Sequence, residues 1–125
     1  MLPWMRVRAG YAALWLGELE EARTIFKEQA AEFQAQSSMI GVAFSLEGMA
    51  ALYVRTGKYE QAARLIGWAD VVHKPSHHRP QVEQADVDRI VSACLLKIGE
   101  EKFSDAYDEG QAMTVERILA LISEA

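Results

Sequence analysis

Residues 17–22 read Gly-Glu-Leu-Glu-Glu-Ala, and residues 57–62, forty positions later, read Gly-Lys-Tyr-Glu-Gln-Ala. The correspondence continues beyond the second stretch, because Phe26 occupies the position that Ile66 occupies in the later copy. A glycine permits the sharp turn that ends one helix and begins the next, and a small alanine lets two helix backbones approach closely. A fixed period of about 20 to 50 residues is typical of stacked helical arrays, so these stretches predict repeated helix pairs.

The rest of the chain supports helices throughout. Apolar residues recur at steps of three and four, and a third, weaker copy of the turn begins at Gly99. The predicted helices cover residues 3–17, 18–36, 37–56, 58–73 and 81–98, with a shorter helix around 103–107 and a last one capped by Thr114. We therefore expect a single all-α domain over residues 1–125, with about seven helices, repeats at about 2–36 and 37–74, and degenerate capping helices at 81–125.

Composition restricts the class of function. The 125 residues carry a net charge of −5, with no basic cluster suited to the phosphates of nucleic acid. No apolar stretch approaches the roughly 20 residues that a membrane span needs, and residues 1–4 do not resemble a secretory signal. The single cysteine, Cys94, fits a reducing compartment. We expect a soluble, cytoplasmic protein that contacts neither nucleic acid nor a membrane directly.

The chain resembles two related groups of helical-repeat proteins. Gly17, Ala22 and Phe26, followed by Gly57 and Ala62, resemble the tetratricopeptide repeat, although the period exceeds the about 34 residues of that family. Residues 45–52 and 57–70 look like the C-terminal repeat region of large LuxR-type transcription regulators and related signal-transduction ATPases. The likeness covers roughly residues 37–125 and includes a proline-containing loop at 75–80 and a Gly-Glu-Glu-x-Phe turn at 99–103.

The resemblance implies antiparallel helix pairs stacked as a right-handed superhelix that acts as a sensor or interaction arm. The chain contains no Gly-x-x-x-x-Gly-Lys-Ser/Thr motif, so we expect no ATPase activity within it. It is either the C-terminal arm of a larger regulator or a free-standing relative. We expect a non-catalytic protein-interaction module in transcription regulation or signalling, without a cofactor. The alternative is a sensor domain that binds a small-molecule inducer between helices.

The candidate partner-binding residues follow from the same likeness. In tetratricopeptide-like stacks the first helix of each pair lines a concave surface, which here would carry Trp4, Tyr11, Trp15, Phe44, Glu47 and Arg55. Tryptophan, tyrosine and arginine dominate the binding energy of many protein interfaces. The competing interpretation is that these aromatic residues belong to the core or pack against a neighbouring repeat.

Other patterns predict no chemistry. His73, His77 and His78 lie near no cysteine, and we interpret their segment as a solvated loop rather than a metal site. Cys94 falls on an apolar helix face and is expected in the core. Acidic residues cluster in first helical turns or on surface faces, at Glu18, Glu20, Glu21, Glu28, Asp105, Asp108 and Glu109. We expect no catalytic residues.

The first helix is unusually apolar for the end of an array. Residues 2–15 include Trp15 and six other large apolar or aromatic side chains, but the only charged residues are Arg6 and Arg8. The second helix can cover only one face of such a helix, and an uncovered apolar stripe is typical of an interface. In a longer parent protein a preceding repeat would cover this stripe; in the isolated chain we expect a homodimer through the first helix.

Overall fold

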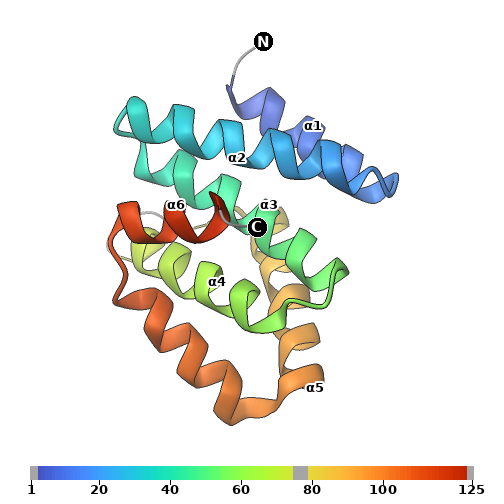
Figure 1. Cartoon of the computed structure of the whole chain (residues 1–125), viewed down its shortest axis with the longest axis vertical. Helices are drawn as coiled ribbons and strands as arrows, with labels where there is room; N and C mark the ends of the chain where they lie inside the picture. Colours follow the sequence, from blue (N-terminus) through green and yellow to red (C-terminus); the bar gives the residue numbers. More distant parts are fainter. Residues whose placement is uncertain (1–2, 75–78, 124–125) are drawn as a thin grey trace.

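A computed structural model of the chain describes residues 3–74 and 79–123, which form six helices and no strand (Figure 1). The helices are α1 (Pro3–Trp15), α2 (Leu19–Ala35), α3 (Met39–Arg55), α4 (Tyr59–His73), α5 (Gln81–Gln111) and α6 (Val115–Ser123). Helix α5 is interrupted at Gly99, whose φ of 83° and ψ of 167° are not helical. Counting its two halves separately gives seven helical segments. The prediction of an all-α fold of paired helices is confirmed.

The turns at Gly17 and Gly57 have the same geometry. Both glycines have positive φ, 80° and 81°. After the first turn, the Glu18 amide donates to the Ala13 carbonyl at 2.9 Å; after the second, the Lys58 amide donates to the Tyr53 carbonyl at 2.8 Å. These bonds satisfy carbonyls at the helix ends in the Schellman pattern, which favours glycine at the left-handed position. The two copies of the sequence motif are therefore two copies of one structural turn.

The helices form two layers. Helices α1, α3 and the first half of α5 lie side by side, while α2, α4 and the second half of α5 form the other layer (Figure 1). Helix α6 runs back over this second layer and contacts α2. The segment expected as capping helices thus forms a third hairpin about Gly99, followed by α6.

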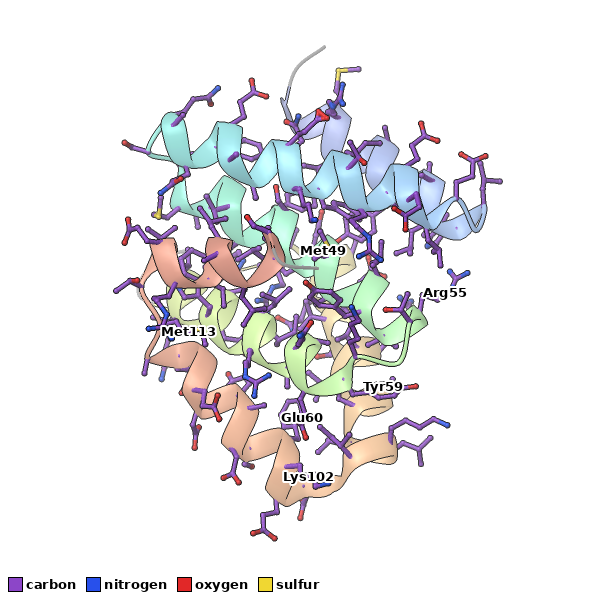
Figure 2. The ribbon with its side chains drawn as sticks, viewed as in Figure 1. Met49, Arg55, Tyr59, Glu60, Lys102 and Met113 are labelled. Carbon is purple, nitrogen blue, oxygen red and sulfur yellow. The ribbon has the colours of Figure 1, made fainter. Side chains whose placement is uncertain are left out.

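The core between the layers depends on small residues. Ala22 and Ala62, the alanines of the repeated motif, are fully buried. The ring of Phe26 inserts between Gly10 of α1 and Gly48 of α3, where a Cβ atom on either glycine would collide with it. Figure 2 shows Met49 of α3 inside the molecule, where it is fully buried, and Lys102 at the outer edge. Close packing at these positions requires the small residues, since interiors tolerate little added volume.

Polar side chains cap two of the helices. Ser38 caps α3, because its hydroxyl accepts a hydrogen bond from the Gly41 amide at 3.2 Å. Ser37 instead adopts the left-handed conformation, with φ 59°, that ends α2. Thr114 caps α6 as expected, because its hydroxyl accepts from the Arg117 amide at 3.2 Å.

Candidate binding groove

A groove runs along the layer formed by α1, α3 and the first half of α5. It consists of two adjoining pockets of about 200 and 260 Å³. Tyr11, Trp15 and Asp86 line both pockets, so the two are continuous. The first pocket is completed by Leu14, Ala51, Val54, Arg55, Arg89 and Ile90, and the second by Arg8, Ala12, Phe44, Val82 and Glu83. Most of this surface is apolar or aromatic, with charged residues at the rim.

Tyr11, on the floor of the groove, packs against two other aromatic rings. The Tyr11 ring packs edge-on against Phe26, with ring centroids 5.4 Å apart, and lies 6.2 Å from the Phe44 ring. Burial, and secondarily the nearby charge of Glu47, raises the pKa of the Tyr11 hydroxyl. Trp15, in contrast, stands at the rim with 77% of its surface exposed. The groove therefore combines a fixed aromatic floor with an exposed indole.

The structure brings four of the six predicted partner-binding residues together. Tyr11, Trp15, Phe44 and Arg55 all line the groove. Trp15 is exposed and so does not belong to the core. The Arg55 guanidinium donates to the Leu14 carbonyl at 2.9 Å, which joins the ends of α1 and α3. The side chain of Trp4 lies outside the described residues.

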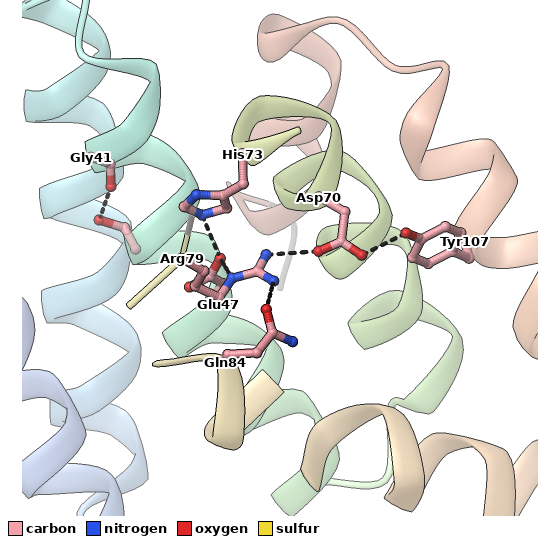
Figure 3. Close-up of polar contacts among 8 residues, drawn as sticks. Gly41, Glu47, Asp70, His73, Arg79, Gln84 and Tyr107 are labelled. Carbon is pink, nitrogen blue, oxygen red and sulfur yellow. Dashed lines mark hydrogen bonds and ion pairs between the residues drawn. The ribbon is translucent and has the colours of Figure 1, made fainter. Parts of the chain in front are cut away.

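Glu47 does not contribute to the groove surface. Its side chain is buried, and its carboxylate accepts hydrogen bonds from Arg79 Nε at 2.8 Å and from His73 Nε2 at 3.0 Å (Figure 3). The proline-containing segment before α5 supplies the arginine, and the last turn of α4 supplies the histidine. A residue enclosed in this way cannot contact a partner in this conformation, so we assign Glu47 to an internal polar network.

Arg79 is the centre of that network. Its guanidinium also donates to Asp70 at 2.7 Å and to Gln84 at 3.0 Å, and Asp70 accepts from the Tyr107 hydroxyl at 2.5 Å (Figure 3). Burial disfavours the charged guanidinium, but the ion pairs with Glu47 and Asp70 outweigh it and raise the pKa of Arg79. The network links α3, α4 and both halves of α5. It fixes the third hairpin against the second.

A separate polar pocket of about 410 Å³ borders this network. It is lined by Asp70, His73, Lys74, Arg79, Gln84, Tyr107 and Gln111. Several of these groups bond to one another, and a small polar molecule in the pocket would have charged and neutral hydrogen-bonding groups beside it.

The other predicted features take ordinary positions. The expectation of a solvated loop is wrong for His73, which ends α4 and pairs with buried Glu47, so that only 12% of its side chain is exposed; His77 and His78 lie outside the described residues. Within residues 3–74 and 79–123, no group of three or more histidine, cysteine or acidic residues is arranged to hold a metal ion. Burial raises the pKa of Cys94 to about 11, so its thiol is protonated near neutral pH. Glu28 and Glu109 pair with Arg6 and Arg64 near the surface, at 3.4 and 3.0 Å.

Sequence reasoning missed the third wall of the groove, which α5 supplies. Val82, Glu83, Asp86, Arg89 and Ile90 all come from its first half. The sequence signal for this wall was Gly99. When Gly99 is aligned with Gly57, Asp86 occupies the repeat position of Phe44, and Arg89 occupies that of Glu47. The missing alanine after Gly99 concealed this equivalence. Ser104 stands at the position of that alanine and is exposed, and this half of α5 approaches α4 closely only further along, at Tyr107 and Gly110.

The fold and the groove define the chain as a repeat-like all-α protein with a mainly apolar groove along one layer. No protein-family model, curated protein or solved structure matches the chain. Among the described helices, none has the length and apolar character needed to cross a bilayer. The geometry of the groove is therefore the basis for a functional proposal.

Proposed function

We propose that this protein is a non-catalytic interaction module that binds a segment of a protein partner in the groove between α1, α3 and α5. The observation that carries the proposal is the exposed indole of Trp15, which borders both apolar pockets. Large aromatic side chains beside apolar pockets are typical of binding hot spots. Exposing them to water has no benefit for folding, whereas a partner that covers them gains apolar burial.

The shape of the groove favours a polypeptide over a small molecule. Trp15 and Val82 are both largely exposed, so the groove is open along this edge. A cavity of about 150 Å³ holds a benzene-sized molecule, so each pocket has room for about one large side chain. Two such pockets in line suit two anchoring side chains of one segment, as in recognition of a peptide by a groove.

We further propose that the partner belongs to a transcriptional or signalling regulator, either as another domain of the same polypeptide or as a separate protein. The support is the likeness of residues 45–52 and 57–70 to the repeat arms of LuxR-type regulators. The glycine turns and buried alanines of both repeats fit a helical-repeat arm in general.

A comparison of two variants tests the main proposal. Wild-type protein, the variant Trp15→Ala/Val82→Ala, and the control Leu96→Ala are each used for cross-linking capture in their native cells. Leu96 is an exposed apolar residue of α5 that does not line the groove. We expect specific partners to be captured by wild type and control but lost with the groove variant. Equal capture by all three proteins would refute the groove as the binding site.

The polar pocket beside Arg79 supports a second candidate function, binding of a small polar inducer. A thermal-shift screen of polar metabolites against wild type and Tyr107→Phe tests it. Stabilisation of wild type that is reduced in Tyr107→Phe and unaffected in Trp15→Ala would favour this candidate. The absence of any stabilising compound would leave the groove as the better-supported site.

A further inference from the structure

We infer that the groove selects a segment that carries acidic residues beside two bulky apolar anchors. This inference rests on the proposed function and adds the chemistry of the partner. It follows from the different exposures of the acidic and basic residues around the groove.

The apolar anchors follow from the pockets. Tyr11, Trp15 and Phe44 surround one of them, and Leu14, Val54 and Ile90 contribute aliphatic surface to the other. Such walls favour aromatic or branched aliphatic side chains, which exclude water from the groove when they enter it.

The acidic residues follow from the rim. The basic side chains are turned outward: Arg8 is 70% exposed and Arg89 is 74% exposed. The acidic side chains that accompany them are more enclosed, because Glu83 is 13% exposed and Asp86 is 32% exposed. The rim therefore presents more guanidinium surface than carboxylate surface to a partner.

The rim arginines have binding capacity beyond their pairs within the chain. Arg8 lies 3.8 Å from Glu83, and Arg89 pairs with Asp86 one helical turn earlier. Because the two guanidinium groups are largely exposed to water, these pairs contribute little stability, so the arginine side chains can adapt when a partner carboxylate arrives. Arginine can also bind a carboxylate through two parallel hydrogen bonds.

Local charge opposes the charge of the whole chain. Arg8, Arg55 and Arg89 against Glu83 and Asp86 give the groove lining a charge of +1, whereas the chain carries −5. Charges more than about 8 Å apart are strongly screened at physiological ionic strength, so contacts at the rim outweigh repulsion from distant carboxylates. Nucleic acid is disfavoured for a different reason: the three arginines of the groove offer few of the phosphate contacts on which its binding depends.

The experiment selects binders from a library of random displayed peptides with purified full-length protein. Peptides that also bind Trp15→Ala/Val82→Ala are removed, which leaves groove-dependent ligands. We expect these ligands to contain two large apolar residues and a net negative charge. Their affinity should fall about tenfold or more for Arg8→Gln/Arg89→Gln, and it should weaken as salt is added.

A matched control removes two charges elsewhere on α5. Lys97 and Lys102 are exposed and do not line the groove, so Lys97→Gln/Lys102→Gln should bind the same peptides with unchanged affinity. Circular dichroism checks that every variant remains helical.

The outcomes distinguish failure of the acidic preference from failure of the interaction module itself. Groove-dependent ligands that are neutral or basic, or that bind Arg8→Gln/Arg89→Gln normally, overturn the acidic preference and leave the interaction module standing. No groove-dependent peptide at all overturns both. Binding of single-stranded oligonucleotides that is lost in Arg8→Gln/Arg89→Gln would assign the rim to nucleic acid instead and overturn the inference.

Discussion

Gly57 has a φ of 81° but lies in an open position, since no described atom lies within 4 Å of an ideal Cβ built there. Any cost of a side chain at this position therefore comes from backbone strain rather than collision. We expect Gly57→Val to lower the free energy of unfolding by more than about 1 kcal/mol, because left-handed backbone is unfavourable for a β-branched residue. Urea denaturation measures this difference.

The control for that variant is Gly57→Asn, because asparagine tolerates the left-handed region better than valine. It should retain clearly more stability than Gly57→Val. If both variants are as stable as wild type, the positive φ of Gly57 does not constrain this turn.

Cys94 provides a prediction about pH. Burial raises its pKa from the ordinary 9.0 to about 11, so the folded protein holds the thiol proton more tightly than the unfolded chain does. The stability from this difference is fully present below about pH 9 and is lost as the pH rises towards 11. Unfolding measured across this range should show a steeper loss for wild type than for Cys94→Ala. Parallel pH profiles would contradict a buried, protonated thiol.

At the scale of helices, the crossing of α4 over the second half of α5 depends on two glycines. A Cβ atom at Gly67 would collide with the Tyr107 carbonyl, and one at Gly110 would collide with the Arg64 carbonyl. In an isolated helix, alanine is better than glycine by about 1 kcal/mol. In this crossing alanine should be less favourable than glycine, because the carbonyl groups of the facing backbone cannot move aside as a flexible side chain can.

We therefore expect Gly67→Ala and Gly110→Ala each to destabilise the protein by about 1–3 kcal/mol in thermal or chemical denaturation. Ser104→Ala serves as the control, because it adds no volume at an exposed position of the same half-helix. An increase in melting temperature for either glycine variant would show that the two helices do not cross this closely.

The ion-pair network is a second contact between helices with a measurable cost. Arg79 and Glu47 are both nearly fully buried, so removing one partner leaves a charge without adequate compensation. We expect Arg79→Met to cost about 3 kcal/mol or more in unfolding free energy. The double variant Arg79→Met/Glu47→Leu should cost less than the sum of the two single changes. Additive costs would mean that the pair is not coupled.

Across the whole molecule, local rules predicted the helices and long-range contacts determined what was missed. Gly17, Gly57 and Thr114 act within a few residues of their own positions, so turns and caps can be recognised from the sequence. The contact between Arg79 and Glu47 joins residues 32 positions apart, and no local pattern indicates it. The same limit applies to the groove: α1 and α3 supply residues that the repeat predicts, whereas the contribution of α5 depends on how the third hairpin packs.

The expected homodimer concerns the outer surface of the molecule. Met5, Trp15 and Leu16 are among the most exposed apolar side chains, and all three belong to α1 or follow it directly. Met5 and Leu16 are three helical turns apart and lie on the same face, with exposed Ala12 between them; this face borders the groove, because Ala12 also lines it. An apolar stripe of this kind at the end of a repeat array is a suitable surface for a second copy, which could pack against it with two-fold symmetry.

Light scattering tests whether this stripe mediates association. We expect wild type to show about twice the chain mass of 14.0 kDa at high concentration. Met5→Asp/Leu16→Asp should be monomeric and still helical, because both side chains are exposed and neither lines the groove. Leu96→Asp, which places one such charge on an exposed site of α5, should remain dimeric because it lies outside the stripe. A wild-type mass near 14 kDa at every concentration would show that α1 does not form a self-association surface. If the Met5→Asp/Leu16→Asp monomer retains binding of groove-dependent peptides, peptide binding does not depend on association.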